Sequence, residues 1–396
     1  MRLIENVVRS AAGPRAIRRD IHAHPELRFE EHRTSDLVAA TLQGYGIPVH
    51  RGLGGTGVVG IIRSGSSKRA IGLRADMDAL PMQEVNTFAH RSRFDGRMHA
   101  CGHDGHTAML LAAAHHLAAN RSFDGSVVLI FQPAEEGGAG ARKMIEEGLF
   151  DRFACDAVFA LHNWPGLPVG HFGVRPGPIM ASTNEFQIRV DGQGGHAAMP
   201  HLTVDPVLAA AQVVQGLQSV VTRERRPIDA AVLSLTMFHA GSASNVIPDS
   251  ATLGGTVRTF DDAVTDLIEQ RIRRVSQLTA QAHGASADVT FQRVYPPTVN
   301  HPQEAEFAAQ LAQDVFGANH VVRNVEPTMA AEDFAFMLRE RPGAYLFIGN
   351  GDGNHRDAGH GAGPCNLHNA AYDFNDDLIP IGGTFWVRLA ERFLAP

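Results

Sequence analysis

"MHACGHDGHTAMLLAAAHHLAA", from Met98 to Ala119, is the stretch that organises this sequence. Its first half brings together four potential metal ligands, Cys101, His103, Asp104 and His106. Its second half is rich in alanine and leucine, which predicts a buried helix over residues 105–119. The sequence therefore places metal-ligating side chains at the start of a helix that has to pack inside the protein.

Other polar residues follow predicted strands in the same part of the chain. "RAIGLRADMDALP" is an apolar run that ends in Asp76 and Asp78, and "GSVVLIFQPAEEGG" is one followed at once by Glu135 and Glu136. "CDAVFALHNWPG" is a third such run, with His162 near its end. Strands that alternate with helices predict an α/β fold, in which residues at the carboxyl ends of the strands meet at one edge of the sheet.

The pattern changes after Met180. The strands "STNEFQIRV", "DAAVLSLTMFHAG", "SATLGGTVRTF" and "SADVTFQRV", with helices over 204–221 and 261–283, give the order β-α-β-β-α-β of a ferredoxin-like unit. Beyond "YPPTVNHP" the α/β pattern returns and ends in a helix that begins at Asp377. We therefore expect a discontinuous α/β domain, residues 1–180 and 295–396, with a domain of residues 181–294 inserted into it.

Composition excludes several classes of function. The 396 residues suggest two domains, with three as the alternative, and a formal net charge of -7 argues against nucleic acid or an anionic membrane as a partner. No apolar run reaches 18 residues, and the N-terminus lacks the apolar core of a signal peptide. Three cysteines are too few for a disulfide framework and favour a reducing compartment, so we expect a cytoplasmic protein.

The residues at the strand ends predict a metal site only as a group. A Cys-x-His pair is usually structural, a Glu-Glu pair at a helix start usually only favours the helix dipole, and His162 alone fits a core histidine. Together, thiolate, imidazole and carboxylate suit manganese, zinc, nickel or iron better than magnesium or calcium. Adjacent glutamates point in different directions, so one can bind metal while the other acts as a base toward water.

Three other features of the sequence are weaker indications of function. "GLGGTG" at 52–57 matches a dinucleotide-binding pattern but precedes a strand instead of opening a helix, which indicates a turn. "HDGH" lacks the glutamate of H-E-x-x-H metalloproteases. Cys101 as a nucleophile is an alternative, but it leaves Glu135, Glu136 and His162 without a role.

The chain resembles the M20 metallopeptidase and amidohydrolase family. The resemblance rests, in order, on "DMDALP", "HACGHDGHTAMLLAAA", "FQPAEEGGAGARKMIEEG", "ALHNWPG", "GGHAAMPH", "ASNVIPDSATLGGTVRTF", "AEDFAFM" and "LHN". It is nearest to the branch of hippurate hydrolases, N-acetyl-amino-acid deacetylases and plant auxin-conjugate hydrolases. It covers nearly the whole chain and says little about the substrate.

The resemblance implies an α/β catalytic domain with a dinuclear metal site and an inserted lid domain that dimerises. It implies two divalent ions per subunit, Mn, Zn or Ni, with Mn favoured by the family. Glu135 matches the general base. His355 and His360 lie in a Gly-rich loop, and we expect them to be solvated or to contact the lid. The implied metal ligands are Cys101, His103, Glu136, His162 and His368.

The resemblance also assigns residues around the substrate. His196 is expected to reach the active site of the partner subunit and stabilise the scissile oxygen, while Asn245 and Arg258 match positions that hold the substrate carboxylate. The motif Asp76-x-Asp78 replaces the His-x-Asp of many members, which leaves the roles of Asp78 and Asp104 open. We place both just outside the ligands, where Asp78 would orient a ligand histidine.

The sequence thus predicts a metal-dependent amidohydrolase that cleaves N-acyl-L-amino acids, hippurate-like or N-acetylated, to a carboxylic acid and an amino acid. A dipeptidase of the same family is the alternative, although no group for a free substrate amine was identified. A metal-free binding protein on the same fold is disfavoured by the complete ligand set and Glu135. We expect a small-molecule substrate and a homodimer, with a tetramer as the alternative.

Overall fold

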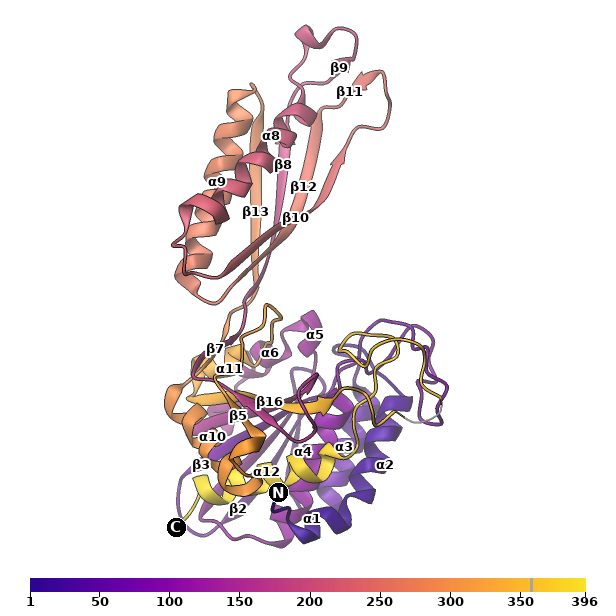
Figure 1. The fold of residues 1–396 in the computed structure, drawn as a ribbon, viewed down its shortest axis with the longest axis vertical. Helices are drawn as coiled ribbons and strands as arrows, with labels where there is room; N and C mark the ends of the chain where they lie inside the picture. The colour runs from indigo at the N-terminus through magenta and orange to yellow at the C-terminus, as the bar shows by residue number, and fades with distance from the viewer. Residues whose placement is uncertain (357–358) are drawn as a thin grey trace. The chain divides into compact units, whose positions relative to one another are not determined.

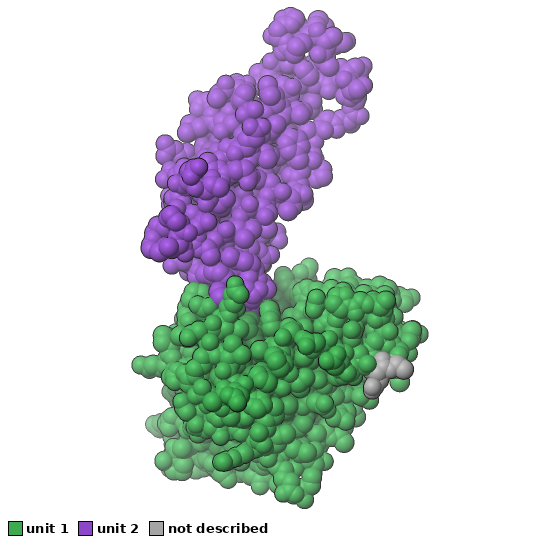
Figure 2. Space-filling view, viewed as in Figure 1, with its two compact units in different colours: residues 1–179, 299–326, 333–396 green, residues 180–298, 327–332 purple. Residues whose placement is uncertain are grey.

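The computed structural model describes residues 1–356 and 359–396 and divides into two compact units (Figures 1 and 2). Unit 1 comprises Met1–Ile179, Val299–Glu326 and Asp333–Pro396, and unit 2 comprises Met180–Thr298 and Pro327–Glu332. Unit 2 includes the short second segment because the Ala181 amide donates to the carbonyls of Thr328, at 3.1 Å, and Ala330, at 2.9 Å. Sequence alone gave no sign of this segment.

Unit 1 is built on an eight-stranded mixed sheet in the order β1-β2-β4-β3-β5-β16-β6-β15 (Figure 1). β3 pairs in parallel with β4 and β5, and β5 pairs in parallel with β16. The strands β3, β4 and β16 are buried along their whole length, as expected for parallel strands covered on both faces. The bounds are β1 (Val49–Leu53), β2 (Gly57–Ser64), β3 (Ala70–Asp76), β4 (Gly125–Gln132), β5 (Ala157–Pro165), β6 (Phe172–Val174), β15 (Val321–Arg323) and β16 (Gly343–Gly351).

Helices surround this sheet, and α4 (His103–Ala119) is the central one. It packs against β3 and against the helices α2 and α12, and most of its residues are buried. The prediction of a buried helix here is confirmed, although the helix begins two residues earlier than expected. The other helices of unit 1 are α1 (Glu5–Ser10), α2 (Ala12–Ala23), α3 (His32–Gly44), α5 (Glu135–Gly138), α6 (Gly140–Glu146), α7 (Leu149–Arg152), α10 (Pro302–Phe316), α11 (Ala335–Glu340) and α12 (Leu378–Phe393), with a 3₁₀ turn at Ala318–His320.

The start of α4 is fixed by a close approach at Gly102. This residue caps the helix with a φ of 92°, a left-handed conformation that favours glycine. A Cβ atom there would lie 2.2 Å from Asn163 Nδ2 and 2.6 Å from Tyr372 Oη. Only glycine therefore lets the helix start lie against the end of β5, and this contact positions Cys101 and His103.

Unit 2 is a four-stranded antiparallel sheet with helices α8 and α9, in the chain order β8-α8-β10-β12-α9-β13 and the sheet order β10-β12-β8-β13. Burial alternates along β8, so one face of the strand packs into the core of the unit. Aspartates cap both helices, Asp205 before α8 and Asp261 before α9. The bounds are β8 (Thr183–Asp191), α8 (Pro206–Ser219), β10 (Ala231–Ala240), β12 (Ser250–Thr259), α9 (Asp262–Ala282) and β13 (Ser286–Tyr295).

Short elements complete the fold. β9 (Gly195–His196) pairs with β11 (Val246–Ile247) in a separate two-stranded sheet, and β7 (Gly177–Met180) pairs with β14 (Thr298–Asn300) where the chain passes between the units. A 3₁₀ turn at Pro200–Leu202 and a π-helical turn at Val220–Glu224 also lie in unit 2. None of the helices in the described residues has the length and apolar character needed to cross a bilayer.

Candidate metal centre

The structure brings the five predicted ligands of unit 1 together. Cys101 and His103 stand at the start of α4, Glu136 follows β4, His162 lies in β5, and His368 lies in the loop before α12. Cys101 Sγ is 3.4 Å from His162 Nε2, and Glu136 Oε1 is 3.1 Å from His368 Nε2. Ligand atoms of Cys101, Glu136 and His368 lie within 4.8 Å of one another.

The predicted base lies in the same cluster. Ligand atoms of His103, Glu135 and Glu136 also fall within 4.8 Å of one another, and the Glu135 side chain is buried. His368 has a φ of 60°, and its amide donates to the Ala100 carbonyl at 2.8 Å. That bond and the left-handed backbone aim an exposed imidazole at the cluster.

Both buried histidines are oriented by backbone carbonyls. His103 Nδ1 donates to the Asp78 carbonyl at 2.8 Å, and His162 Nδ1 donates to the Asn163 carbonyl at 2.7 Å. Such a bond leaves Nε2 as the available ligand atom. Within residues 1–356 and 359–396, the buried Nε2 of His103 has no hydrogen-bond partner.

The charges of the cluster suit a divalent cation. Burial would lower the pKa of His103, but the negative charges of Asp76, Asp78 and Glu136 raise it to about 10. Burial, together with Glu136 and Glu135, raises the pKa of the Cys101 thiol well above its usual value. Buried negative charge requires a compensating cation, and thiolate, imidazole and carboxylate are transition-metal ligands.

Asp78 fixes the two glutamates through their backbone. Its Oδ1 accepts from the Glu135 amide at 3.0 Å, and its Oδ2 accepts from the Glu136 amide at 2.9 Å. Glu136 and Gly137 leave helical geometry within this turn. Asp78 therefore holds the Glu135–Glu136 backbone with its carboxylate and His103 with its carbonyl.

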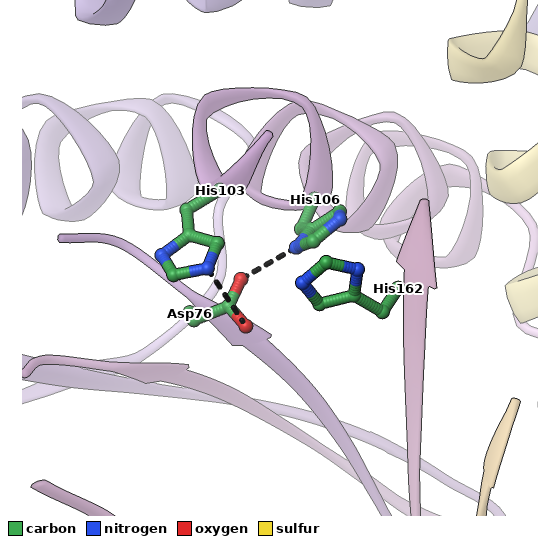
Figure 3. Close-up of side chains that lie close together, drawn as sticks. All are labelled: Asp76, His103, His106 and His162. Atoms are coloured by element: carbon green, nitrogen blue, oxygen red, sulfur yellow. Dashed lines mark hydrogen bonds and ion pairs between the residues drawn. The ribbon is translucent and has the colours of Figure 1, made fainter. Parts of the chain in front are cut away.

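Asp76 and His106 form a second group with His103 and His162, and no sequence motif indicated a role for these two residues (Figure 3). His106 Nδ1 donates to Asp76 Oδ1 at 2.6 Å, and its Nε2 accepts from the Asn163 amide at 2.9 Å. Both ring nitrogens of His106 are thus used, so the residue is a support and not an open ligand. The spacing of three residues from His103 places both on one helix face and could have indicated this.

Both carboxylate oxygens of Asp76 also accept hydrogen bonds from neighbouring side chains. Arg74 Nη1 donates to Asp76 Oδ2 at 2.7 Å, while His103 Nε2 lies 3.7 Å from that oxygen. The buried Arg74 and the two histidines hold the pKa of Asp76 well below its usual value against the effect of burial. Asp76 thereby supplies negative charge beside His103 from a fixed position.

The expectation that Asp104 lies beside the metal ligands is wrong. Its Oδ2 lies 3.1 Å from Arg18 Nε and 2.9 Å from His22 Nδ1, on the side of α4 that faces α2. Burial would raise the pKa of Asp104, but Arg18 and His22 hold it below its usual range. Successive residues of a helix point about 100° apart, so Asp104 turns away from the cluster that His103 joins.

The expectation that His355 and His360 are solvated is wrong. His355 Nε2 lies 3.2 Å from the Asp373 carbonyl, and His360 Nε2 lies 3.1 Å from Asp373 Oδ2. Asp373 is buried within unit 1, so these histidines fold onto it and are not free in solvent. Among the described residues, neither joins a candidate ligand group.

Unit 2 places its three predicted residues in two separate places, His196 and Asn245 at the small β9-β11 sheet and Arg258 in the four-stranded sheet. His196 in β9 pairs with Val246, and the Ala197 amide donates to the Asn245 carbonyl at 3.1 Å. Arg258 lies in β12, and its Nη1 bonds Thr183 Oγ1 at the start of β8. β8 runs from Thr183 to Asp191 before the chain reaches His196, which is ~26 Å at 3.3 Å per residue. The structure therefore joins His196 to Asn245 but separates both from Arg258.

The chain matches a known protein family and is similar to characterised relatives. Residues 72–392 match the model of peptidase family M20/M25/M40. The chain is 40% identical over 394 residues to a hippurate hydrolase of Campylobacter jejuni, covering 100% of both chains. It is 39% identical to an N-acetyl-L-cysteine deacetylase of Bacillus subtilis, covering 96% of this chain and 87% of the relative.

One solved structure is similar to this chain over nearly the whole length of both. A dinuclear metal-binding peptidase of the M20 family from Bacillus subtilis superimposes with a TM-score of 0.84 at 34% identity, covering 97% of this chain and 98% of that one. The buried donor cluster and this likeness together identify unit 1 as the carrier of a divalent metal site.

We predict that Cys101→Ser lowers the metal content of the purified protein, because a hard hydroxyl replaces a soft thiolate ligand. Elemental analysis after dialysis measures the loss. Cys155→Ser is the matched control, since Cys155 is a buried free thiol of the same unit that lies outside the candidate ligand groups of the described residues. A Cys101→Ser protein with full metal and no activity would contradict the ligand assignment and favour a nucleophile.

Proposed function

The chain belongs to peptidase family M20/M25/M40, and on this basis we propose that it hydrolyses the amide bond of N-acyl-L-amino acids, releasing a carboxylic acid and an amino acid. It is a metal-dependent hydrolase of the amidohydrolase type. The observation that carries the proposal is the group formed by Glu135, Glu136 and His103, which sets a base beside metal ligands. Full-length similarity to a hippurate hydrolase supports an N-acylated substrate.

The site would hold two divalent metal ions, Mn, Zn or Ni, on Cys101, His103, Glu136, His162 and His368. Bound there, divalent ions would supply Lewis acidity, which polarises the amide carbonyl and lowers the pKa of water. The donor set and the available Nε2 atoms of the two buried histidines support this assignment.

The chain's own groups would perform the proton transfers. Glu135 takes a proton from the attacking water and delivers it to the leaving amine. Asp78 would hold the backbone of both glutamates in place by accepting from their two amides. His196 would stabilise the oxygen of the scissile carbonyl as negative charge develops on it.

The substrate-binding residues support a homodimer. Arg258 would grip the substrate carboxylate, because its guanidinium can donate two parallel bonds to a carboxylate. His196 and Asn245 lie at the β9-β11 sheet, about the length of β8 away from Arg258 and too far to share one small substrate with Arg258 of their own chain. The proposal is that His196 and Asn245 serve the site of the partner subunit.

The three free cysteines are compatible with a cytoplasmic location, which we also propose.

The alternative of a dipeptidase would need an acidic or polar group for the free amine of the substrate. No observation on unit 1 favours it over an N-acylated substrate, so a single function is proposed.

Glu135→Gln tests the assignment of the base. The amide keeps the shape of the side chain but cannot take a proton, so kcat should fall about 10²–10⁴-fold while metal content and KM stay near wild type. Glu146→Gln, at an exposed glutamate of α6, is the control and should behave as wild type. Near-normal kcat for Glu135→Gln would exclude Glu135 as the base.

Subunit mixing tests the dimer. Glu135→Gln and His196→Ala should each be nearly inactive alone. After joint unfolding and refolding, about half of the dimers are mixed and carry one intact site, so roughly a quarter of wild-type activity should return. If a tag shows subunit exchange and no activity returns, His196 does not act on the partner's site.

A further inference from the structure

Glu31 is a fully buried carboxylate that faces the turn carrying the proposed base. Its Oε1 accepts from the Phe29 amide at 3.0 Å and from the Ala134 amide at 2.8 Å. Its Oε2 accepts from the Thr56 hydroxyl at 2.6 Å. The side chain has no exposed surface, and 103 residues separate it from Ala134 along the chain.

The two amides that share Oε1 belong to residues with unusual backbones. Phe29 has a φ of 64° and Ala134 a φ of 54°, both in the left-handed region that disfavours residues other than glycine. A single carboxylate oxygen thus pins two unfavourable conformations. Such conformations persist only where surrounding contacts hold them.

Glu31 continues a row of carboxylate contacts along the turn. Glu31 receives the amide of Ala134, and Asp78 receives the next two amides, those of Glu135 and Glu136. Three consecutive amides are therefore held by two buried carboxylates. Released from Glu31, Ala134 would be free to leave the left-handed region, and the direction of the following Glu135 side chain would change with it.

We propose that Glu31 is a positioning residue for the reaction, which fixes the turn at Ala134 so that Glu135 reaches the attacking water. The proposal rests on the proposed function, because it takes Glu135 as the base. It also gives a role to the "GLGGTG" turn between β1 and β2, since that turn presents Thr56 to Glu31.

The packing of the turn supports this role. A Cβ atom at Gly138 would lie 2.7 Å from Ala134 Cβ and 3.0 Å from Phe29 Cε2, so Phe29 covers the turn closely. Because Glu31 accepts from the amides of both Phe29 and Ala134, it fixes the position of Phe29 relative to the turn at Ala134. A base displaced by about 1 Å is expected to lose roughly 10²-fold in rate.

Glu31 acts through the placement of its oxygens. Every bond described above goes to an amide or a hydroxyl, and a glutamine can accept the same two amides with its Oε1 while its Nε2 donates to Thr56. Burial and the charge of Asp78 raise the pKa of Glu31 to about 7, so the site already tolerates a neutral side chain near neutral pH. Glutamine should therefore substitute, whereas alanine should not.

The test compares Glu31→Ala, Glu31→Gln and Glu30→Ala as metal-loaded proteins on an N-acyl amino acid that the wild type cleaves. Glu30 is the matched control, because it is an exposed neighbouring carboxylate that pairs with Arg97. We expect kcat of Glu31→Ala to fall about 10- to 100-fold with KM and metal content within about twofold of wild type. Glu31→Gln and Glu30→Ala should retain at least about half of wild-type kcat.

Hydrogen exchange gives a second measurement that does not depend on activity. Amides in the peptide 131–138 should exchange about 10- to 100-fold faster in Glu31→Ala than in wild type or Glu31→Gln, since the bond to Ala134 is lost. Thr56→Val removes one bond of Glu31 and should give a smaller loss of kcat in the same direction, which keeps the test usable if Glu31→Ala does not fold.

Wild-type kcat in Glu31→Ala, or a loss in Glu31→Gln equal to that in Glu31→Ala, would overturn the proposal. Wild-type kcat in Thr56→Val with an unfolded Glu31→Ala would overturn it as well. These outcomes are separate from the failure of the proposed function, which would appear as near-normal kcat in Glu135→Gln.

Discussion

Buried negative charge beside the ends of β3, β4 and β5 is the constraint on which the site depends. The carboxylates of Asp76, Asp78, Glu135 and Glu136 lie close to His103, and all of them except Glu136 belong to buried residues of unit 1. Carboxylates in such a place are stable only if amides, arginine or a cation face them. Backbone amides and Arg74 donate hydrogen bonds to some of these carboxylates, and bound metal ions would compensate the charge of the others.

The carboxylates fall into two sets by this criterion. Asp76, Asp78 and Glu31 are closed, because hydrogen bonds from Arg74, His106, backbone amides and Thr56 engage their oxygens. Glu136 instead meets His368 and Cys101 in a candidate ligand group. The closed set holds the backbone, and the proposed reaction uses Glu135 and Glu136.

Strand geometry predicted that the polar residues after the buried strands would lie at one edge of the sheet, whereas the individual metal ligands rest on the family resemblance. Prediction from sequence failed for Asp104 because helix rotation, not sequence proximity to His103, decides which way a side chain points. It failed for Glu31 because the contact with Ala134 spans 103 residues and no local pattern marks it. The contacts of His355 and His360 with Asp373 could not be predicted, because the glycine-rich sequence around the histidines has no pattern that indicates them.

Metal-dependent cleavage of N-acyl amino acids is most directly tested with apoenzyme. The protein is stripped with a chelator, and a panel of N-benzoyl and N-acetyl amino acids, with a dipeptide for comparison, is assayed before and after addition of Mn, Zn or Ni. The account predicts that activity on N-acylated substrates is lost with the metal and returns with at least one of these ions. Hydrolysis by fully metal-free protein, or cleavage of the dipeptide alone, would contradict it.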